Sequence, residues 1–252
     1  MSSFTTGRTL DATGQPVDGT GFEVEHGSLL AELLAERTGP VTSHPTRPVW
    51  SAPLDAPEDA IRSLTVVGAG YDGPPTHYHR QSEEAFDVRR GAVTLTLDGT
   101  DRTVRAGECA TVETGVVHTF RNDGNERAVL VTTIRAPGRL EQVLPTLGGL
   151  AHDSGTDPTD PLQQVMIARR LAGNTVFTRQ EGAVTGALTD ALAPVARLAG
   201  YRGAYAKYTR RAFWRRHVEQ PDLGTADPAD RRTGNGRRTV DADADPVPGT
   251  GG

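Results

Sequence analysis

Three histidines and a pair of glutamates have the residue types of a metal site. His77 and His79 are separated by one residue, Glu83 and Glu84 follow closely, and His118 comes roughly forty residues later. Residues i and i+2 of a β-strand point to the same face, so His77 and His79 project together if this stretch is extended. Three imidazoles and a carboxylate make a complete ligand set for one divalent metal.

A His-x-His pair on its own is more often a surface feature than a metal site. The carboxylate and the third histidine are what favour metal binding here. The ligand types suit Fe, Mn, Ni, Co, Cu or Zn and do not choose among them. Four protein ligands leave two positions open on an octahedral ion, which water, dioxygen or a substrate can occupy, and open positions distinguish a reactive site from a structural one.

The elements that must position these residues are short strands. Between about Ile61 and Arg135, apolar runs alternate with turn residues such as Asp98-Gly99. Val93, Leu95 and Leu97 alternate with polar residues, which is typical of a half-buried strand. Strands are predicted at Ile61–Val67, Ala85–Arg89, Val93–Leu97, Thr103–Arg105, Cys109–Glu113, Val117–Arg121 and Ala128–Ile134. Many short strands at this spacing favour a sandwich or barrel over residues 59–136.

Residues 1–58 are predicted to form an N-terminal arm with one helix. The first 21 residues or so are polar and glycine-rich, which predicts a loose segment. An amphipathic pattern over Phe22–Arg37 predicts the helix, and Gly39-Pro40 ends it. Four prolines between Pro45 and Pro57 then predict an extended connection.

Residues 137–217 are predicted to form a helical extension, and residues 218–252 a disordered tail. The helix candidates are Arg139–Leu147, Pro161–Leu171, Ala183–Leu198 and Ala204–His217. Pro194 should end or bend the third of these. Its leucines and valine, Leu188, Leu192, Val195 and Leu198, should bury one face. The tail is rich in Asp, Pro, Gly and Arg, and has too few apolar residues to offset the entropy of ordering.

Two spaced motifs resemble those of a known family. The first reads H-x-H-x4-E-x6-G through His77, His79, Glu84 and Gly91, and the second reads G-x5-E-x-G-x2-H-x3-N from Gly107 to Asn122 through Glu113, Gly115 and His118. Together they resemble the paired motifs of the cupin superfamily, over about residues 60–136. The resemblance implies an antiparallel jelly-roll barrel in a mainly β protein, with metal ligands at His77, His79, Glu84 and His118. Glu84, not Glu83, has the family spacing. Glu113 stands where the family usually has Pro, and we expect it to point outward.

The single-barrel form is similar to quercetin dioxygenase-like cupins. This resemblance implies an oxygenase that acts on a small enolic or phenolic substrate, with Glu84 either staying a ligand or acting as the catalytic base. Inward-facing Phe86, Val88, Leu95 and Phe120 are the candidate substrate-binding residues, although plain barrel core is the interpretation we favour for most of them. The same fold also serves isomerases, decarboxylases and non-catalytic binding or sensing modules.

Composition gives little reason to expect a nucleic-acid-binding, disulfide-bonded or secreted protein. The net charge of −5 gives no reason to expect nucleic acid binding. The single cysteine, Cys109, rules out an internal disulfide, and we interpret it as a small buried residue rather than a nucleophile. The N-terminus has no apolar segment typical of a signal peptide, so we expect a cytoplasmic protein.

The segment 201–217 combines aromatic residues with lysine and arginine and contains no acidic residue. Such a helix can lie on an anionic membrane surface, or pack its aromatic side on the barrel or on a second subunit. We favour packing. Because single-barrel cupins commonly pair, the resemblance also implies a homodimer.

Overall fold

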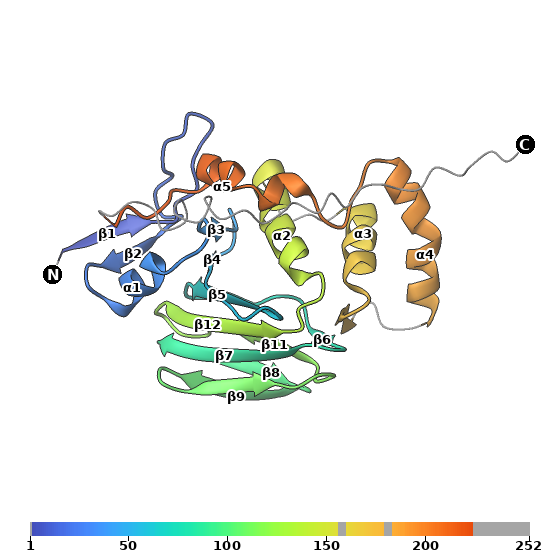
Figure 1. Ribbon diagram of the computed structural model, residues 1–252, viewed down its shortest axis with the longest axis horizontal. Helices are drawn as coiled ribbons and strands as arrows, with labels where there is room; N and C mark the ends of the chain where they lie inside the picture. The colour runs from blue at the N-terminus through green and yellow to red at the C-terminus, as the bar shows by residue number, and fades with distance from the viewer. Residues whose placement is uncertain (1, 156–159, 179–182, 224–252) are drawn as a thin grey trace, which may run out of the picture.

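The computed structural model describes residues 2–155, 160–178 and 183–223, and these residues form a mixed α/β fold with two large antiparallel sheets and a third of two strands (Figure 1). The six-stranded sheet has the order β10 (Cys109–Val112), β7 (Glu83–Arg90), β12 (Ala128–Arg135), β5 (Ala60–Val67), β4 (Val49–Pro53), β3 (Thr42–Ser43). The five-stranded sheet has the order β13 (Thr175–Phe177), β6 (His77–His79), β11 (His118–Arg121), β8 (Ala92–Leu97), β9 (Thr100–Arg105). All seven strands predicted from the sequence are present, within three residues at each end.

One hydrophobic core lies between the two sheets. Strand β7 buries Phe86 and Val88 on one face, and β8 buries Val93 and Leu95, as the period-2 patterns predict. The hairpin from β8 to β9 turns at Asp98-Gly99, where φ is +47° and +81°. Two successive positive φ values suit a tight hairpin turn, and Asp-Gly is among the pairs that adopt it at lowest cost.

The other face of the six-stranded sheet is covered by N-terminal elements and by helix α5 (Arg211–His217). The N-terminal elements are β1 (Ser3–Thr6), β2 (Phe22–Glu25) and α1 (Leu29–Ala35) (Figure 1). Trp50 of β4 and Trp214 of α5 are buried in this second core. The Trp50 indole nitrogen donates a hydrogen bond to the Gly7 carbonyl at 2.9 Å, which ties the N-terminal segment to the sheet.

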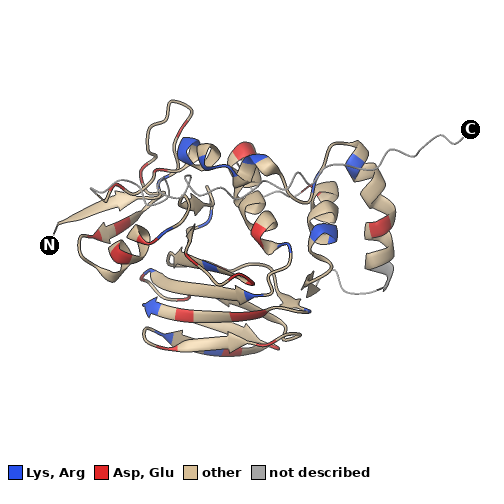
Figure 2. Cartoon of the chain, viewed as in Figure 1, with Lys and Arg blue, Asp and Glu red and all other residues tan. Residues whose placement is uncertain are grey.

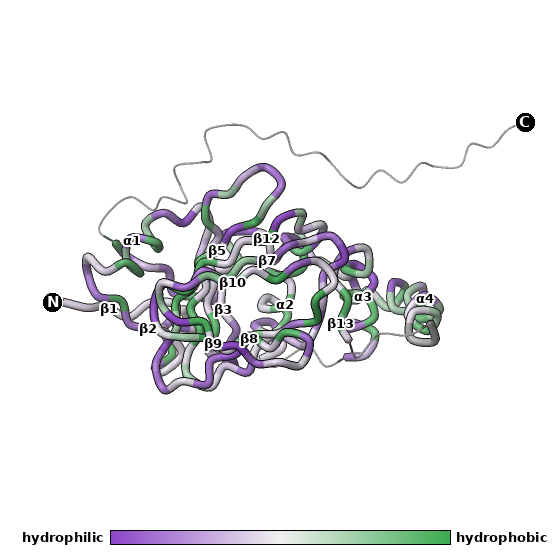
Figure 3. Tube along the Cα trace, turned by 90° about the horizontal axis from the view of Figure 1, so that it is seen from below, coloured by the Kyte–Doolittle hydropathy of each residue, from purple (hydrophilic) through white to green (hydrophobic). Residues whose placement is uncertain are grey.

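Helices of the C-terminal half lie beside the sheets. Helix α2 (Leu140–Ser154) and helix α3 (Pro161–Leu171) form a third core with Ile134 at the end of β12. Helix α4 (Ala183–Leu198) packs on α3 and lies at one end of the molecule (Figures 1 and 3). The sequence predicted a mainly β protein. The structure instead shows a mixed fold of antiparallel sheets and C-terminal helices.

Several sequence predictions are wrong near the N-terminus. Residues Phe22–Glu25 form strand β2, paired with β1, and the helix begins only at Leu29. The cause is local: Gly27 adopts φ +72°, and the Ser28 side chain caps the helix by accepting a hydrogen bond from the Ala31 amide. The first residues are also not loose, because β1 pairs with β2 and Arg8 forms an ion pair with Glu219.

The proline-rich stretch also contains strands. Strand β4 pairs with β5 along its whole length, and β3 extends the same sheet. Pro53 ends β4 at an exposed position, and Pro48 precedes the strand, so neither interrupts the ladder in its middle. Tertiary pairing therefore turns a predicted connection into part of the sheet.

The C-terminal half agrees with prediction in one helix and differs from it in two places. Helix α4 spans Ala183–Leu198 as predicted, and it continues past Pro194 instead of ending there. Among the side chains of α4 that the structure describes, Ala193 and Ala196 are buried, Leu192 is partly exposed, and Leu188, Val195 and Leu198 are exposed, so the predicted apolar face is not the buried one. The predicted helix Ala204–His217 is divided into a short 3-10 helix, η2 (Ala206–Thr209), and α5.

Aromatic residues of segment 201–217 pack inward: Tyr208 and Trp214 are both buried. The chain stays packed beyond α5, because Val218 is buried and the Gln220 side chain exchanges hydrogen bonds with the Val41 backbone. The rest of the predicted disordered tail, residues 224–252, lies outside the described residues.

Charged residues of both signs are distributed over the strands and helices, with few on α4 (Figure 2). Within the described ranges, each helix is too short or too polar to cross a bilayer.

Candidate metal centre

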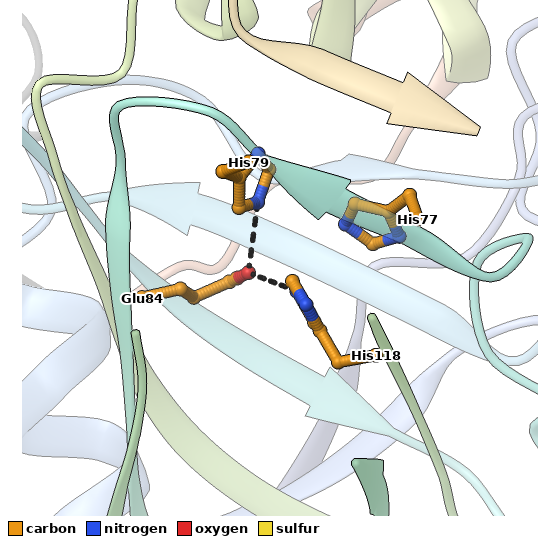
Figure 4. Close-up of side chains that lie close together, drawn as sticks. All are labelled: His77, His79, Glu84 and His118. Carbon is orange, nitrogen blue, oxygen red and sulfur yellow. Dashed lines mark hydrogen bonds and ion pairs between the residues drawn. The ribbon is translucent and has the colours of Figure 1, made fainter. Parts of the chain in front are cut away.

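The four predicted ligands converge from both sheets. His77 and His79 come from β6 and His118 from β11 of the five-stranded sheet, whereas Glu84 comes from β7 of the six-stranded sheet. One nitrogen or carboxylate oxygen from each residue lies within 4.8 Å of the others. The close-up in Figure 4 shows His79 and His118 aimed at the Glu84 carboxylate, with His77 beside them.

Distances in the cluster fit a common ion. The Glu84 Oε2 atom lies 3.3 Å from His79 Nε2 and 3.1 Å from His118 Nε2 (Figure 4). Two ligand atoms at right angles on one ion, each about 2.1 Å from it, are about 3 Å apart. His79, Glu84 and His118 are buried, and His77 is partly exposed at the edge of the cluster.

Backbone carbonyls fix the tautomers of two imidazoles. His77 Nδ1 lies 2.8 Å from the Pro75 carbonyl, and His118 Nδ1 lies 2.9 Å from the Val116 carbonyl. A carbonyl only accepts, so in both rings Nδ1 carries a proton and donates it. In the neutral ring, Nε2 then has a lone pair directed into the cluster, which is the form that binds a metal.

Electrostatics in the cluster favour an ionised Glu84. Burial alone would raise the pKa of this carboxyl group, but hydrogen bonds that His118 and His79 donate when their rings are protonated outweigh burial and lower the pKa to about 2. For His118, burial would lower the pKa, yet the hydrogen bond and charge of Glu84 raise it overall. Burial and the neighbouring His118 lower the pKa of His77 to about 4. At neutral pH the cluster therefore holds an anionic oxygen beside a neutral His77.

A strand of the C-terminal extension borders this cluster, and the sequence interpretation missed it. Strand β13 pairs with β6 in the register Thr175 to His79 and Phe177 to His77. The Thr175 hydroxyl lies 3.0 Å from His79 Nδ1, and the Phe177 and His77 ring centroids are 6.1 Å apart. The three residues Thr-Val-Phe have strand propensity, but so short a run between two predicted helices is too weak a signal to use.

The predicted substrate-binding residues have different environments. Phe86, Val88 and Leu95 are fully buried in the core between the sheets. Phe120 is partly exposed and lies two residues after His118 on β11, so both point to the same face of the strand. Their role in substrate binding stays a prediction.

The remaining candidates lie outside the cluster. Glu83, the first residue of β7, and Glu113, which follows the end of β10, are both exposed. The interpretation of Cys109 as a buried residue is wrong: this residue is exposed on β10, where Ala110 and Val112 are the buried positions.

Comparisons with known proteins identify a family for part of the chain. Residues 63–134 match the model of the cupin domain family. No curated protein matches the chain. The chain is similar to the solved structure of a sugar phosphate isomerase of the cupin superfamily from Silicibacter pomeroyi, with 21% identity, a TM-score of 0.34, and coverage of 38% of this chain and 69% of that one.

Two further structures show the same level of similarity. A predicted oxalate decarboxylase from Thermotoga maritima has 20% identity and a TM-score of 0.35, with 39% of this chain and 92% of that one covered. KdgF from Halomonas sp. has 16% identity and a TM-score of 0.33, with 35% and 79% covered. Matches this distant do not identify a reaction. The family model and the buried cluster of three histidines and one glutamate together show that residues 63–134 are a domain of the cupin superfamily.

Proposed function

We propose that the protein is a metal-dependent cupin, in which His77, His79, Glu84 and His118 hold one divalent transition metal. The observation that carries the proposal is the approach of two Nε2 atoms to one carboxylate oxygen, at 3.1 and 3.3 Å. In His118 the Nδ1 proton is committed to a carbonyl, so a neutral ring has no proton to donate to Glu84. A cation between these atoms, or a proton on the imidazole, is needed to make the contact favourable. On this proposal the two sheets are the walls of a jelly-roll barrel.

We propose further that the reaction is oxygenation of a small enolic or phenolic substrate. The metal would supply Lewis acidity, which lowers the pKa of a bound enol or phenol. Glu84 is ionised at neutral pH, so it can accept the proton that the substrate loses if its carboxylate leaves the metal; otherwise it stays a ligand. Burial of His79, Glu84 and His118 keeps bulk water from these donor atoms.

The aromatic residues around Phe120 favour a flat substrate. Phe120 shares a strand face with His118 and keeps some exposed surface, and its ring lies 5.3 Å from that of Phe86 and 5.7 Å from that of Tyr71. Rings at such distances form a rigid apolar wall. We assign Phe120 to contact with substrate, and Phe86, Val88 and Leu95 to the support behind it.

Elemental analysis of protein purified without added metal tests the centre itself. We expect about one equivalent of a transition metal per chain, held through dialysis. Oxygen uptake then tests the reaction, with a flavonol and a 1,3-diketone as substrates. Uptake that depends on substrate and is lost in Glu84→Gln supports an oxygenase. Metal content near one without uptake for either class would instead favour a binding or sensing cupin, or an isomerase or decarboxylase.

A further inference from the structure

The three imidazoles of the cluster are not oriented in the same way. His77 and His118 each place Nδ1 against a backbone carbonyl two residues earlier, at Pro75 and Val116. His79 instead places Nδ1 against the Thr175 hydroxyl, 96 residues later in the chain. The segment 63–134 that matches the cupin domain therefore contains all four donor residues, but the partner that orients His79 lies outside it.

The contact between His79 and Thr175 is shielded from water. His79 is 2% exposed and Thr175 is 3% exposed. If His79 binds a metal through Nε2, its Nδ1 carries the proton and donates it to the threonine oxygen. Because both groups are buried, water cannot readily replace the hydroxyl if it is removed, and the Nδ1–H group would be left without an acceptor.

The neighbouring residue holds the loop that joins two of the proposed ligands. The Asn174 carbonyl accepts a hydrogen bond from the Arg80 amide at 2.7 Å, and the Asn174 side-chain oxygen accepts one from the Gln81 amide at 3.0 Å. The Asn174 amide group donates to Ser82 Oγ and to the Ala136 carbonyl. Residues 80–82 connect His79 to the strand that carries Glu84, so Asn174 fixes the path between these two donors.

We propose that the C-terminal extension is a structural part of the metal centre, with Thr175 as the positioning residue of His79. In the tautomer with a proton on Nδ1, the hydroxyl accepts that proton and holds the ring so that the Nε2 lone pair faces the cluster. The inference rests on the proposed metal site, and it goes beyond it by assigning metal affinity to a residue of β13, in a segment outside the matched domain.

Substitutions at position 175 separate the hydroxyl from the shape of the side chain. Thr175→Val keeps a β-branched side chain suited to a strand but removes the acceptor, whereas Thr175→Ser keeps the acceptor. Thr178→Val is the matched control, because Thr178 Oγ1 lies near the same strand pair and donates to the backbone carbonyl of Thr76 instead of to a proposed ligand. All three are made in the full chain.

Affinity for Co(II), measured by competition with a chelator, is the primary readout. We expect Thr175→Val to bind Co(II) about 10- to 100-fold more weakly than the wild type, which is the usual effect of losing a partner of a ligating histidine. Thr175→Ser and Thr178→Val should stay within about threefold of the wild type. Thermal unfolding of the metal-free variants shows whether a loss of affinity comes from a loss of folding.

Two results would overturn the proposal: wild-type affinity in Thr175→Val, or an equal loss in Thr175→Ser. A wild type that binds no Co(II) would instead reject the proposed metal site. Should Thr175→Val not fold, nitrogen NMR of the Zn(II)-loaded wild type decides. A slowly exchanging proton on His79 Nδ1 supports the proposal, and a proton on Nε2 contradicts it.

Discussion

His118 and His77 are direct cross-strand partners where β11 meets β6, and their ring centroids lie 4.4 Å apart. On its other side His118 pairs with Leu97 of β8. The third histidine is therefore placed by backbone ladders on two sides and not by a loop. Such a position is fixed before any ion binds, which is the condition for a preorganised metal site.

Replacing His118 should remove the metal without removing the fold. We expect His118→Ala to lower metal affinity at least about 100-fold, because it deletes a donor and leaves the Glu84 charge less well compensated. Elemental analysis after dialysis measures the loss. His26→Ala is the control, since His26 is exposed and remote from the cluster, and it should keep full occupancy. Full metal content in His118→Ala would contradict the assignment of this ligand.

Metal should stabilise the folded chain, and a chelator should reverse the effect. A ligand present at 100 times its dissociation constant adds about 2.7 kcal/mol to the free energy of unfolding if it binds only the folded state. We expect the thermal unfolding temperature to rise when Co(II) is added and to fall again with excess chelator. In Glu84→Gln the rise should be much smaller, because the anionic donor is absent. An equal rise in both proteins would point to binding elsewhere.

Acid should destabilise the metal-free protein through two histidines. Burial lowers the pKa of His77 to about 4, and burial with the nearby His217 lowers that of His152 to about 4 as well. Both groups bind protons more weakly in the folded state than in the unfolded one, where the pKa is near 6.5. Their contribution to stability is therefore complete above about pH 6.5 and is lost as the pH falls toward 4.

Urea unfolding at pH 7 and pH 5 tests this dependence. His118, whose pKa is raised, adds stability as the pH falls and offsets part of the loss from His77 and His152 in the chelated wild type. His152→Gln should lose less stability than the wild type between the two values, because one of the two groups with a lowered pKa is gone. An equal loss in both proteins would show that His152 titrates normally in the folded state.

Trp214 should be a major source of stability far from the cluster. It is 2% exposed in the core between the sheet and α5, and its indole nitrogen donates to the Tyr208 carbonyl at 2.7 Å. We expect Trp214→Ala to lower the free energy of unfolding by about 3–5 kcal/mol. Leu198→Ala provides the comparison, because Leu198 is 91% exposed and its loss should cost less than about 0.5 kcal/mol. Urea denaturation measures both, and similar values would show that α5 is not packed as described.

Gly73 permits a close backbone contact beside the metal cluster. Its φ is +83°, and a Cβ atom built there would lie 2.0 Å from the Phe120 carbonyl oxygen. Gly73→Ala should therefore both strain the backbone and push β11 away from the segment that leads into β6. Gly70→Ala isolates the first effect, since Gly70 has φ +71° but no atom within 4 Å of such a Cβ.

We expect Gly70→Ala to lower the free energy of unfolding by about 1–2 kcal/mol through backbone strain alone. Gly73→Ala should lower it clearly more, and it should also weaken Co(II) binding. If both variants lose the same stability and Gly73→Ala keeps wild-type affinity for Co(II), the chain accommodates the added methyl group beside Phe120 without moving β11.

The sequence by itself predicted seven strands of the two large sheets and the four residues that form the cluster. Alternation along residues such as Val93 and Leu95 is a local signal, because the two faces of a strand meet different surroundings. The spacing of His77 and His79 is likewise local, since it follows from the geometry of one strand. These features needed no knowledge of the rest of the chain.

Only the tertiary structure decided which distant segments complete the sheets and the site. Strands β1 and β4 come from stretches whose glycines and prolines indicated loops, and they are strands because remote partners satisfy their backbone groups. Thr175 is an unremarkable threonine in the sequence, and it lies against His79 only because β13 returns to pair with β6. Pairing between segments far apart in the sequence depends on burial and backbone hydrogen bonds throughout the fold. A local sequence pattern therefore cannot predict it.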